Sequence, residues 1–394
     1  MQEADAALAL GRAVCACKPR QARTGAFVNL LIQPGDSVGP LIRGIEKARK
    51  SVEIVIFRFD RIEIERALKE AAKRGVFVHA LIAYTNRGGE KNLRKLEMRF
   101  LAAGITVART SDDLVRYHGK MMLVDRKQLY VFGFNFTHLD IERSRSFGIV
   151  TSRRLLVQEA IRLFECDTKR QVYSAGHDNF LVSPVNARRQ LANFIKGARK
   201  ELLIYDLKIT DRAMRRLLED RARAGVEVRI IGKITGKTGN VTVRKLHDFR
   251  LHTRTIVRDR RRIFIGSQSL RELELDARRE IGVILNEPKV VNGIVKVFEE
   301  DWNQADVSKA QSDDEAVSPA VDKAAKQVAK DIARKLPPVG PVVEKVIEGV
   351  TRGANDIDVD HKEIEETVKG AVKAAVREAV QEVIEEIEDR RETR

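Results

Sequence analysis

Short apolar runs alternate with amphipathic segments along most of the chain. Residues 52–57 (VEIVIF) and 76–82 (VFVHALI) are nearly continuous apolar runs, typical of strands buried on both faces. Residues 62–74 between them have apolar positions at helical spacing, and Gly75 follows where such a helix would end. Strands that alternate with helices in this way predict an α/β layer structure with a parallel or mixed sheet.

The same alternation extends to either side of these segments. We expect a strand at residues 27–34, a helix at 38–50, a Gly-rich loop at 86–89, a helix to about residue 103 and a strand at 105–109. These elements lead into a polar cluster at residues 117–137. The first half of the chain is therefore predicted to form one α/β lobe that ends in this cluster.

The second half repeats the first at a constant offset. Residues 48–50 and 198–200 both read Ala-Arg-Lys, and the Gly-Val pair at 75–76 recurs at 225–226, an offset of 150 residues in each case. After that the second copy is 16 residues shorter, so its polar cluster follows the first by 134 residues. Two long units predict two similar lobes packed face to face rather than a solenoid.

Each half carries the same polar triplet beside apolar, strand-like runs. The first copy has His118, Lys120 and Asp125, followed by Gly133 and Asn135. The second copy has His252, Arg254 and Asp259 at the same spacing, followed by Gly266, Ser267 and Ser269. Polar groups at the ends of buried strands can face a cleft.

This duplicated pattern resembles the phospholipase D superfamily, whose motif is His-x-Lys-x4-Asp-x6-Gly-Ser-x-Asn carried twice. The resemblance covers residues 27–303 and implies two pseudo-symmetric α/β/α sandwich lobes whose motifs meet at the interface. We therefore expect a leader at 1–26, a first lobe at 27–167, a second lobe at 168–305, a linker at 306–318 and a helical tail at 319–394.

The residue types fit phosphodiester cleavage without a metal. The reaction needs a nucleophile, a proton donor for the leaving alkoxide and fixed cations around the phosphoryl oxygens. Imidazole titrates near neutral pH, so one ring can be nucleophilic while the other is acidic. The resemblance implies a phosphohistidine on one histidine, while the other protonates the leaving group and then activates water or an alcohol.

The family pattern assigns a role to each residue of the two motifs. His118 is the expected nucleophile and His252 the general acid/base, with the reverse assignment open. Lys120 and Arg254 would clamp the phosphate, together with Asn135 and Ser267. Asp125 and Asp259 would hold the local fold, and the remaining substrate-side candidates are Ser269 and Glu280.

Several positions depart from the family pattern. Arg254 replaces Lys, which keeps the charge on a bulkier planar group. Ser269 replaces Asn, and Phe132-Gly133 replaces Gly-Ser. Family members carry an acid 28 residues after each motif histidine that orients the imidazole; Glu280 has this place after His252, and Ser146 has it after His118. Two alternatives therefore stay open: an enzyme of reduced activity, and a catalytically silent scaffold that binds anionic lipid or nucleic acid.

The cysteine content and the length of the apolar runs limit the cellular compartments that we expect. The 394 residues include only three cysteines, Cys15, Cys17 and Cys166, which fits a reducing compartment. No apolar run is long enough to span a bilayer, and residues 1–20 lack the basic start of a secretory signal. We expect a cytoplasmic protein, with peripheral contact to a membrane as the alternative.

The net charge of +16 is unevenly spread. Residues 306–394 carry 15 Lys and Arg against 21 Asp and Glu, so residues 1–305 carry a net charge of +22. A positive body attracts polyanions, either nucleic acid or an anionic membrane. Family analogy favours a phospholipid substrate, with a nuclease as the alternative. We expect no metal and no cofactor, because neither motif has the ligand spacing of a hydrolytic metal site.

Helical segments in the tail and a glycine-containing segment at residues 232–238 also need an interpretation. Residues 321–336 and 364–387 have apolar positions at helical spacing, which predicts amphipathic helices that pack on the body or pair between chains. Residues 232–238 (GKITGKT) resemble a phosphate-binding loop but have three residues rather than four between the glycines. We interpret this segment as a flexible loop beside the cleft.

Overall fold

The computed structural model describes residues 27–84, 90–111, 113–236, 239–246 and 248–307, all within one compact unit. The expected leader, the loop at 86–89, the linker from residue 308 onward and the helical tail lie outside the described residues. Asp306 and Val307, which we expected in the linker, instead pair as strand β18 with β12 of the second lobe.

The first lobe is built on a mixed sheet. Its strands are β1 (Val28–Gln33), β2 (Ser51–Ile56), β3 (Phe77–Ile82), β4 (Thr106–Arg109), β6 (Met121–Val124), β7 (Gln128–Phe132) and β8 (Ser144–Thr151). They lie in the order β1-β8-β7-β6-β2-β3-β4. β2, β3 and β4 are parallel, and the other pairs are antiparallel.

The second lobe repeats this arrangement. Its strands are β9 (Phe180–Val182), β10 (Glu201–Ile209), β11 (Glu227–Ile234), β12 (Val241–Lys245), β14 (Arg254–Arg258), β15 (Arg262–Gly266), β17 (Ile281–Leu285) and β18 (Asp306–Val307). Their order is β18-β12-β11-β10-β14-β15-β17-β9, with β10, β11 and β12 parallel. The predicted fold class, two similar α/β lobes in one chain, is confirmed.

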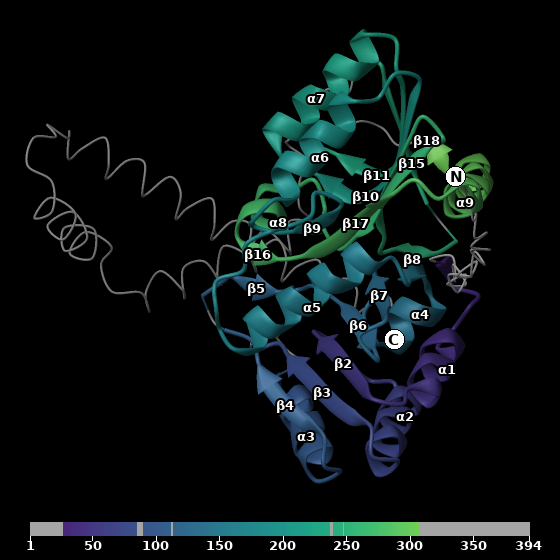
Figure 1. The fold of residues 1–394 in the computed structure, drawn as a ribbon. Helices are drawn as coiled ribbons and strands as arrows, with labels where there is room; N and C mark the ends of the chain where they lie inside the picture. Colours follow the sequence, from purple (N-terminus) through teal and green to yellow (C-terminus); the bar gives the residue numbers. More distant parts are fainter. Residues whose placement is uncertain (1–26, 85–89, 112, 237–238, 247, 308–394) are drawn as a thin grey trace, which may run out of the picture. The chain divides into compact units, whose positions relative to one another are not determined.

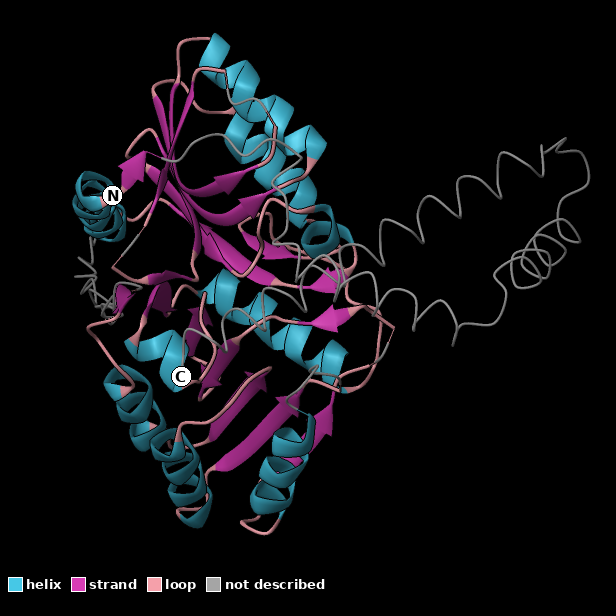
Figure 2. Ribbon diagram, turned by 180° about the vertical axis from the view of Figure 1, so that it is seen from behind, coloured by secondary structure: helices cyan, strands magenta, loops and turns pink. Residues whose placement is uncertain are grey.

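Helices cover the outer face of each sheet, and two long helices lie between the sheets (Figures 1 and 2). The helices are α1 (Gly39–Lys47), α2 (Ile62–Lys73), α3 (Glu90–Leu101), α4 (His138–Glu142), α5 (Arg154–Thr168), α6 (Ala187–Lys196), α7 (Arg212–Arg223), α8 (Glu272–Asp276) and α9 (Pro288–Gln304). α5 contacts β6 and β7 of the first lobe and β9 of the second. α9 likewise contacts β1 and β14.

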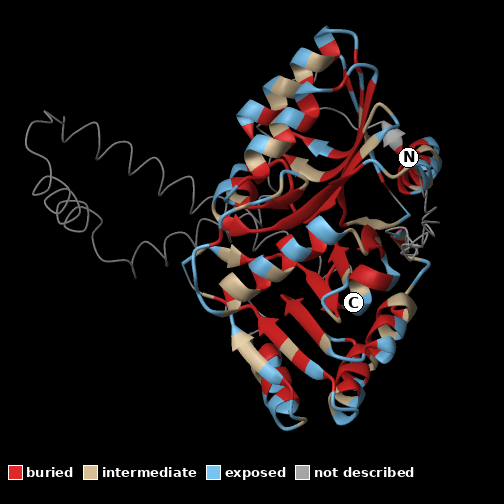
Figure 3. Cartoon of the chain, viewed as in Figure 1, coloured by how far each residue is buried: buried red, intermediate tan, exposed pale blue. Residues whose placement is uncertain are grey.

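Each central strand is largely apolar because it contributes to two cores. In β10, Leu202 and Ile204 pack in the core beneath α6 and α7, whereas Leu203 and Tyr205 face the core shared by the two lobes. Figure 3 shows these strands buried along their length. Burial on both faces removes the polar alternation of a one-sided strand, which explains the continuous apolar runs in the sequence.

The segment resembling a phosphate-binding loop begins as a strand. Residues 232–234 continue β11, so the expected loop is wrong for this part of the segment. Gly232 has φ +144°, and a Cβ there would lie 1.7 Å from the carbonyl oxygen of Asp206. The glycine is therefore explained by the close approach of β10 and not by phosphate binding.

The two lobes exchange short strands. β5 (Arg116–Tyr117) of the first lobe pairs in parallel with β16 (Arg278–Arg279) of the second. β13 (Arg250–Leu251) of the second lobe pairs in the same way with β8 of the first. Each exchanged strand directly precedes a motif histidine, so backbone pairing across the interface positions both histidines.

The motif aspartates close the hairpins that begin at these histidines. Asp125 and Asp259 have φ 53° and 54°, and the arginine after each is also left-handed, the geometry of a tight hairpin turn. Asp tolerates this conformation better than most residues. Each carboxylate also accepts three backbone N–H groups, from Arg49, Lys50 and Ser51 or from residues 199–201.

We expect Asp259→Ala to lower the free energy of unfolding by about 1–3 kcal/mol, because three N–H groups lose their acceptor. Burial alone raises the pKa of Asp259, but the donors from Lys200, Arg199 and Glu201 outweigh it and the pKa lies below 3.8. The stabilisation is therefore present above about pH 4 and is lost as the pH falls through the lowered pKa.

Urea unfolding of Asp259→Ala at pH 7 and pH 3 tests this prediction. Asp220→Ala is the matched control, because Asp220 makes only an exposed ion pair with Arg223. Equal stability of the two variants at pH 7 would contradict the structural role of Asp259.

Candidate active site

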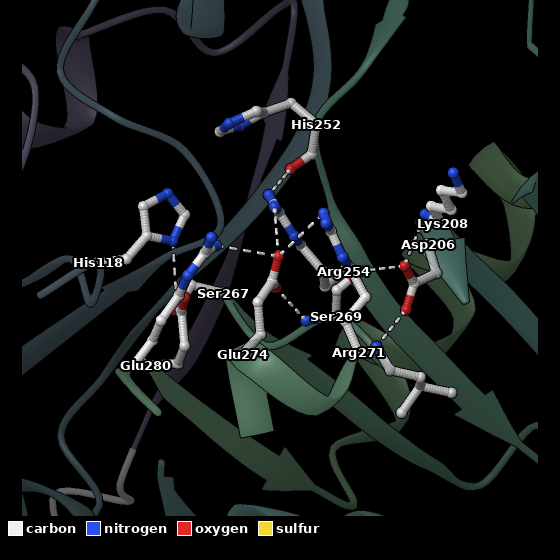
Figure 4. Close-up of polar contacts among 12 residues, drawn as sticks. His118, Asp206, Lys208, His252, Arg254, Ser267, Ser269, Arg271, Glu274 and Glu280 are labelled. Atoms are coloured by element: carbon white, nitrogen blue, oxygen red, sulfur yellow. Dashed lines mark hydrogen bonds and ion pairs between the residues drawn. The ribbon is translucent and has the colours of Figure 1, made fainter. Parts of the chain in front are cut away.

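The two motif histidines occupy equivalent places at the lobe interface. The backbone N–H of His118 donates to Arg279 of the second lobe, and that of His252 donates to Arg145 of the first. Both imidazoles are nearly fully buried, with 6% and 5% of the residue surface exposed. Figure 4 shows both rings in one polar cluster above Glu274. The structure therefore brings together the two residues that lie 134 positions apart in the sequence.

His118 has a polar partner on each ring nitrogen. Its Nδ1 lies 2.9 Å from Oε2 of Glu280, and its Nε2 lies 2.8 Å from Nζ of Lys120. The Glu280 carboxylate assigns the N–H to Nδ1, so Nε2 carries the lone pair and accepts the hydrogen bond from Nζ of Lys120. Phe57 packs edge-on against the imidazole, with 4.7 Å between the ring centroids.

Burial is the main cause of the unusual titration of this group. It holds the pKa of His118 well below 6.5, and the nearby charges of Lys120 and Arg254 lower it further. The pKa of Lys120 is likewise held well below 10.5, chiefly by burial.

The place of Glu280 corrects one sequence-based interpretation. We expected this acid to orient His252, the histidine of its own lobe, but its carboxylate hydrogen-bonds to His118 of the other lobe. The cause is the strand exchange, since Glu280 directly follows β16, which pairs with the strand that leads into His118. Burial, and then the charge of Glu274, raises the pKa of Glu280 to about 7.

His252 has a different environment. Its Nδ1 lies 3.5 Å from Oδ2 of Asp140 and is buried without a hydrogen-bond partner among the described residues. The same oxygen of Asp140 accepts two hydrogen bonds from Asn135. Ser146 has the place equivalent to Glu280, directly after the residue that binds the His252 backbone, and its buried hydroxyl is also unpartnered within the described chain.

Arg254 is held by backbone and carboxylate together. One of its terminal nitrogens donates to the carbonyl oxygen of His252 at 2.9 Å, and the other lies 3.8 Å from Glu274. Glu274 also pairs with Arg278 at 3.4 Å and Arg271 at 3.7 Å, as the dashed lines in Figure 4 show. Burial opposes ionisation of Glu274, but these three arginines outweigh it and its pKa lies below 4.5.

The smaller polar residues of the two motifs also differ. The amide nitrogen of Asn135 donates to Asp140, and its Oδ1 is buried without a partner among the described residues. Ser267 Oγ accepts the backbone N–H of Ile281 at 3.1 Å. The hydroxyl of Ser269 donates to Asp206, so in this structure it is committed to a neighbouring carboxylate.

Sequence analysis missed three buried acids of this cluster. Asp140 and Glu274 are equivalent residues of α4 and α8, each with a carboxylate bound by the backbone N–H of Asn135 or Ser269. They share the 134-residue offset of the motifs, a signal that could have identified them. Asp206 has no equivalent, because Ile56 occupies its place in the first copy. Burial raises the pKa of Asp206 to about 6.

The described residues limit which partners the structure could bind. Within those ranges there is no cluster of three or more His, Cys, Asp or Glu side chains that could hold a metal ion. Of the helices that the structure describes, none combines the length and apolar character needed to cross a bilayer.

Fold and paired motifs together define a two-lobe phospholipase D-like protein. The family model described as "Cardiolipin synthase, PLD-like domain" matches residues 41–168 and 191–302, more than half of the chain. The chain therefore belongs to this phospholipase D-like family.

Part of the chain is similar in sequence to two curated relatives. Proteins named mitochondrial cardiolipin hydrolase from Danio rerio and Mus musculus are each 31% identical over 137 residues, 33% of this chain. That match spans 57% of the first protein and 58% of the second, so the chain covers little more than half the length of these curated relatives.

The solved structures show the shared fold alone, because their sequence identities are low. A polyphosphate kinase from Porphyromonas gingivalis has a TM-score of 0.61 at 20% identity, covering 70% of this chain and 47% of its own. A phosphatidylserine synthase from Haemophilus influenzae Rd KW20 has a TM-score of 0.58 at 13% identity, covering 78% and 94%.

Proposed function

We propose that this protein is a metal-independent phosphodiesterase or phosphatidyltransferase that acts on phospholipids through a phosphohistidine. The observation that carries the proposal is the geometry of His118. Its Nδ1 hydrogen-bonds to Glu280, and its Nε2 hydrogen-bonds to Nζ of Lys120. A buried imidazole fixed in one tautomer and facing a cation is the arrangement that nucleophilic attack on phosphorus requires.

In the first step, Nε2 of His118 attacks phosphorus and the bond to the leaving oxygen breaks. Lys120 from the first lobe and Arg254 from the second would stabilise the negative charge on the phosphoryl oxygens, because their side chains are cationic. Glu280 would stabilise the positive charge that develops on the His118 ring. His252, from the other lobe, would give its proton to the leaving oxygen and would then be neutral for the second step.

In the second step, an acceptor hydroxyl gives its proton to His252, and its oxygen attacks the phosphohistidine. The P–N bond breaks and its electron pair returns to Nε2 of His118. Water as acceptor gives hydrolysis, and an alcohol gives phosphatidyl transfer. The two outcomes share the first step and differ in whether water is excluded from the intermediate.

The phospholipid assignment is supported by the description of the family and by the names of the curated relatives, which concern cardiolipin. The strong positive charge of residues 1–305 suits docking on an anionic membrane surface. The same charge favours nucleic acid as the second candidate substrate.

The test is a turnover assay of purified protein in EDTA on three substrates. These are vesicles that contain cardiolipin and phosphatidylglycerol, single- and double-stranded DNA and RNA, and the chromogenic diester bis(p-nitrophenyl) phosphate. We expect turnover of the chromogenic diester and of lipid, unchanged within about twofold by EDTA, since the mechanism assigns no step to a metal.

Each other outcome identifies an alternative. Turnover of nucleic acid without lipid would assign a nuclease. Binding of vesicles without turnover of any diester would assign a scaffold. Full loss of activity in EDTA, restored by a divalent metal, would overturn the two-histidine mechanism.

A further inference from the structure

Two arginines close the β14–β15 hairpin at the end of the second lobe that lies away from the motif histidines. Arg258 is the last residue of β14 and Arg262 the first of β15, and they are direct partners in the antiparallel register. The strand rises about 13 Å from Arg254 to Arg258. The pair is therefore separate from the cluster around His252.

The two guanidinium groups lie over one aromatic ring. Cζ of Arg258 is 5.0 Å from the ring centroid of Phe194, and Cζ of Arg262 is 5.8 Å from it. Arg258 donates to the carbonyl oxygen of Phe194 at 3.3 Å, and Arg262 donates to Oδ1 of Asn179 at 3.2 Å. Because Phe194 is a buried residue of α6, both cations are held against a rigid surface.

Neither arginine of the pair has a carboxylate partner within the described part of the chain. The carboxylate of Asp259, in the turn between them, accepts the backbone N–H groups of residues 199–201. Glu201, at the same end of the lobe, pairs with Arg260 at 2.6 Å. The acids of this end are thus bound to other groups.

The positive charge of the pair is therefore uncompensated. Like charges placed directly opposite each other on neighbouring strands are destabilising. Burial is the main cause that lowers the pKa of Arg258, and the charges of Arg262 and Arg199 lower it further. Both arginines of the pair are only partly buried, so an anion from solvent can reach them.

The first lobe forms the same hairpin without this feature. Val124 and Gln128 pair at the equivalent places, and Gly44 has the place of Phe194. The fold therefore does not require two arginines over an aromatic ring. A role beyond folding is the better explanation for them.

The neighbouring helix adds to the positive field at this end of the second lobe. Arg221 of α7 donates to the carbonyl oxygen of Lys196, at the end of α6, at 3.4 Å. α7 carries five arginines against two acids, whereas α2, at the equivalent place in the first lobe, carries three basic and three acidic residues. This field attracts anions to the second lobe in particular.

We propose that Arg258 and Arg262 form a second anion site that binds one phosphate group, either free phosphate or a phosphate presented by a lipid headgroup. The planar fork of a guanidinium matches the oxygens of a phosphate, and two forks can share one group. The bound anion would remove the repulsion within the pair. This site takes no part in the chemistry of the two histidines and goes beyond the proposed function.

The first measurement is the rate at which phenylglyoxal modifies each arginine of the full-length protein, determined by peptide mapping. It is made with and without inorganic phosphate at constant ionic strength. We expect phosphate at about ten times its Kd to slow the modification of Arg258 and Arg262 about tenfold, because only the unoccupied fraction reacts. Arg212 and Arg216, which are exposed on α7, should react at an unchanged rate.

Two double variants separate this site from general positive charge. Arg258→Val with Arg262→Gln copies the first lobe at both positions, and Arg212→Gln with Arg216→Gln removes the same charge from α7. Phosphate should raise the melting temperature of wild type and of the α7 variant equally, and that of the first variant by less. Both variants should keep kcat on bis(p-nitrophenyl) phosphate.

Vesicles of phosphatidylcholine that also contain phosphatidic acid identify the source of the phosphate group. A loss of vesicle affinity of about tenfold or more in the first variant, and a smaller loss in the α7 variant, would assign a lipid headgroup. Unchanged vesicle binding together with protection by inorganic phosphate would assign free phosphate.

The absence of phosphate protection at Arg258 and Arg262, or equal protection at Arg212 and Arg216, would overturn the second anion site. Protection by single-stranded DNA but not by phosphate would also overturn it and would indicate a nucleic-acid surface. If the first variant fails to fold, the protection measured in the wild-type protein still decides.

Discussion

His118→Ala is expected to abolish turnover of every diester substrate, with a loss in kcat on the order of 10⁴-fold or more, because it removes the group assigned to form the covalent intermediate. The side chain is nearly buried and contacts Glu280 and Lys120, so the cavity left by alanine faces polar groups. The measurement is kcat on bis(p-nitrophenyl) phosphate, with folding checked by circular dichroism.

His138→Ala is the matched control for this substitution. His138 lies on α4, is more than half exposed and pairs with Glu142 at 3.2 Å, outside the cluster around Lys120. We expect its activity within twofold of wild type. Retained activity in His118→Ala would contradict the assignment of the nucleophile.

His252→Ala should separate the two steps. The acceptor step loses its base, so the acid-labile, base-stable phosphohistidine should accumulate on His118 and be found there by peptide mapping. Accumulation of the phosphoryl group on His252 in the His118→Ala protein would reverse the two roles.

Glu280→Gln is expected to lower kcat about 10²- to 10⁴-fold, since a neutral amide cannot stabilise the positive charge on His118 and can bind the wrong tautomer. The pKa of Glu280 is raised to about 7, mainly by burial and then by Glu274. In the wild type, kcat/KM should therefore rise with pH to a plateau above about 7. The variant should lack this rise.

The ionised form of Glu280 that supports activity should lower the stability of the folded protein. The folded pKa of Glu280 lies above its ordinary 4.5, so ionisation opposes folding as the pH rises from about 4.5 through 7. Glu280→Gln removes this opposition, and we expect its melting temperature at pH 8 to be no lower than that of wild type. Low activity in a protein of unchanged stability separates a role in orientation and charge from a role in folding.

Glu65→Gln provides the comparison for Glu280→Gln. Glu65 is a buried carboxylate of α2 that pairs with Arg99 and Lys69 on the outer face of the first lobe. Burial raises its pKa, but the Arg99 hydrogen bond is the largest cause and the pKa lies below 4.5. Its substitution should therefore lower stability and leave kcat unchanged, the reverse of Glu280→Gln.

Much of this arrangement could be predicted from the sequence because it is local or periodic. The continuous apolar runs identified the central strands, since a strand buried on both faces has no polar alternation. Gly75 marked the end of α2 because it takes φ +83°, and Gly225 ends α7 in the same way at φ +85°. The repeat offset then placed both histidines in equivalent positions.

Only the tertiary structure decided which acid serves which histidine. A spacing of 28 residues from His252 to Glu280 suggested a pair within one lobe, but β5 and β16 pair across the interface and carry Glu280 to His118. The acid beside His252 is likewise Asp140 of the other lobe, 3.5 Å from its Nδ1. Asp206 joined the cluster without a local signal, because only the fold of the second lobe places it beside Ser269.

The sequence by itself determined the repeated elements, the two histidines and their cationic neighbours, since these depend on patterns within each half of the chain. The tertiary structure determined the pairing of charges, and with it the difference between His118 and His252. The physical reason is that a buried proton is governed by groups within a few ångströms, and here the carboxylates beside the two rings, Glu280 and Asp140, come from the opposite lobe.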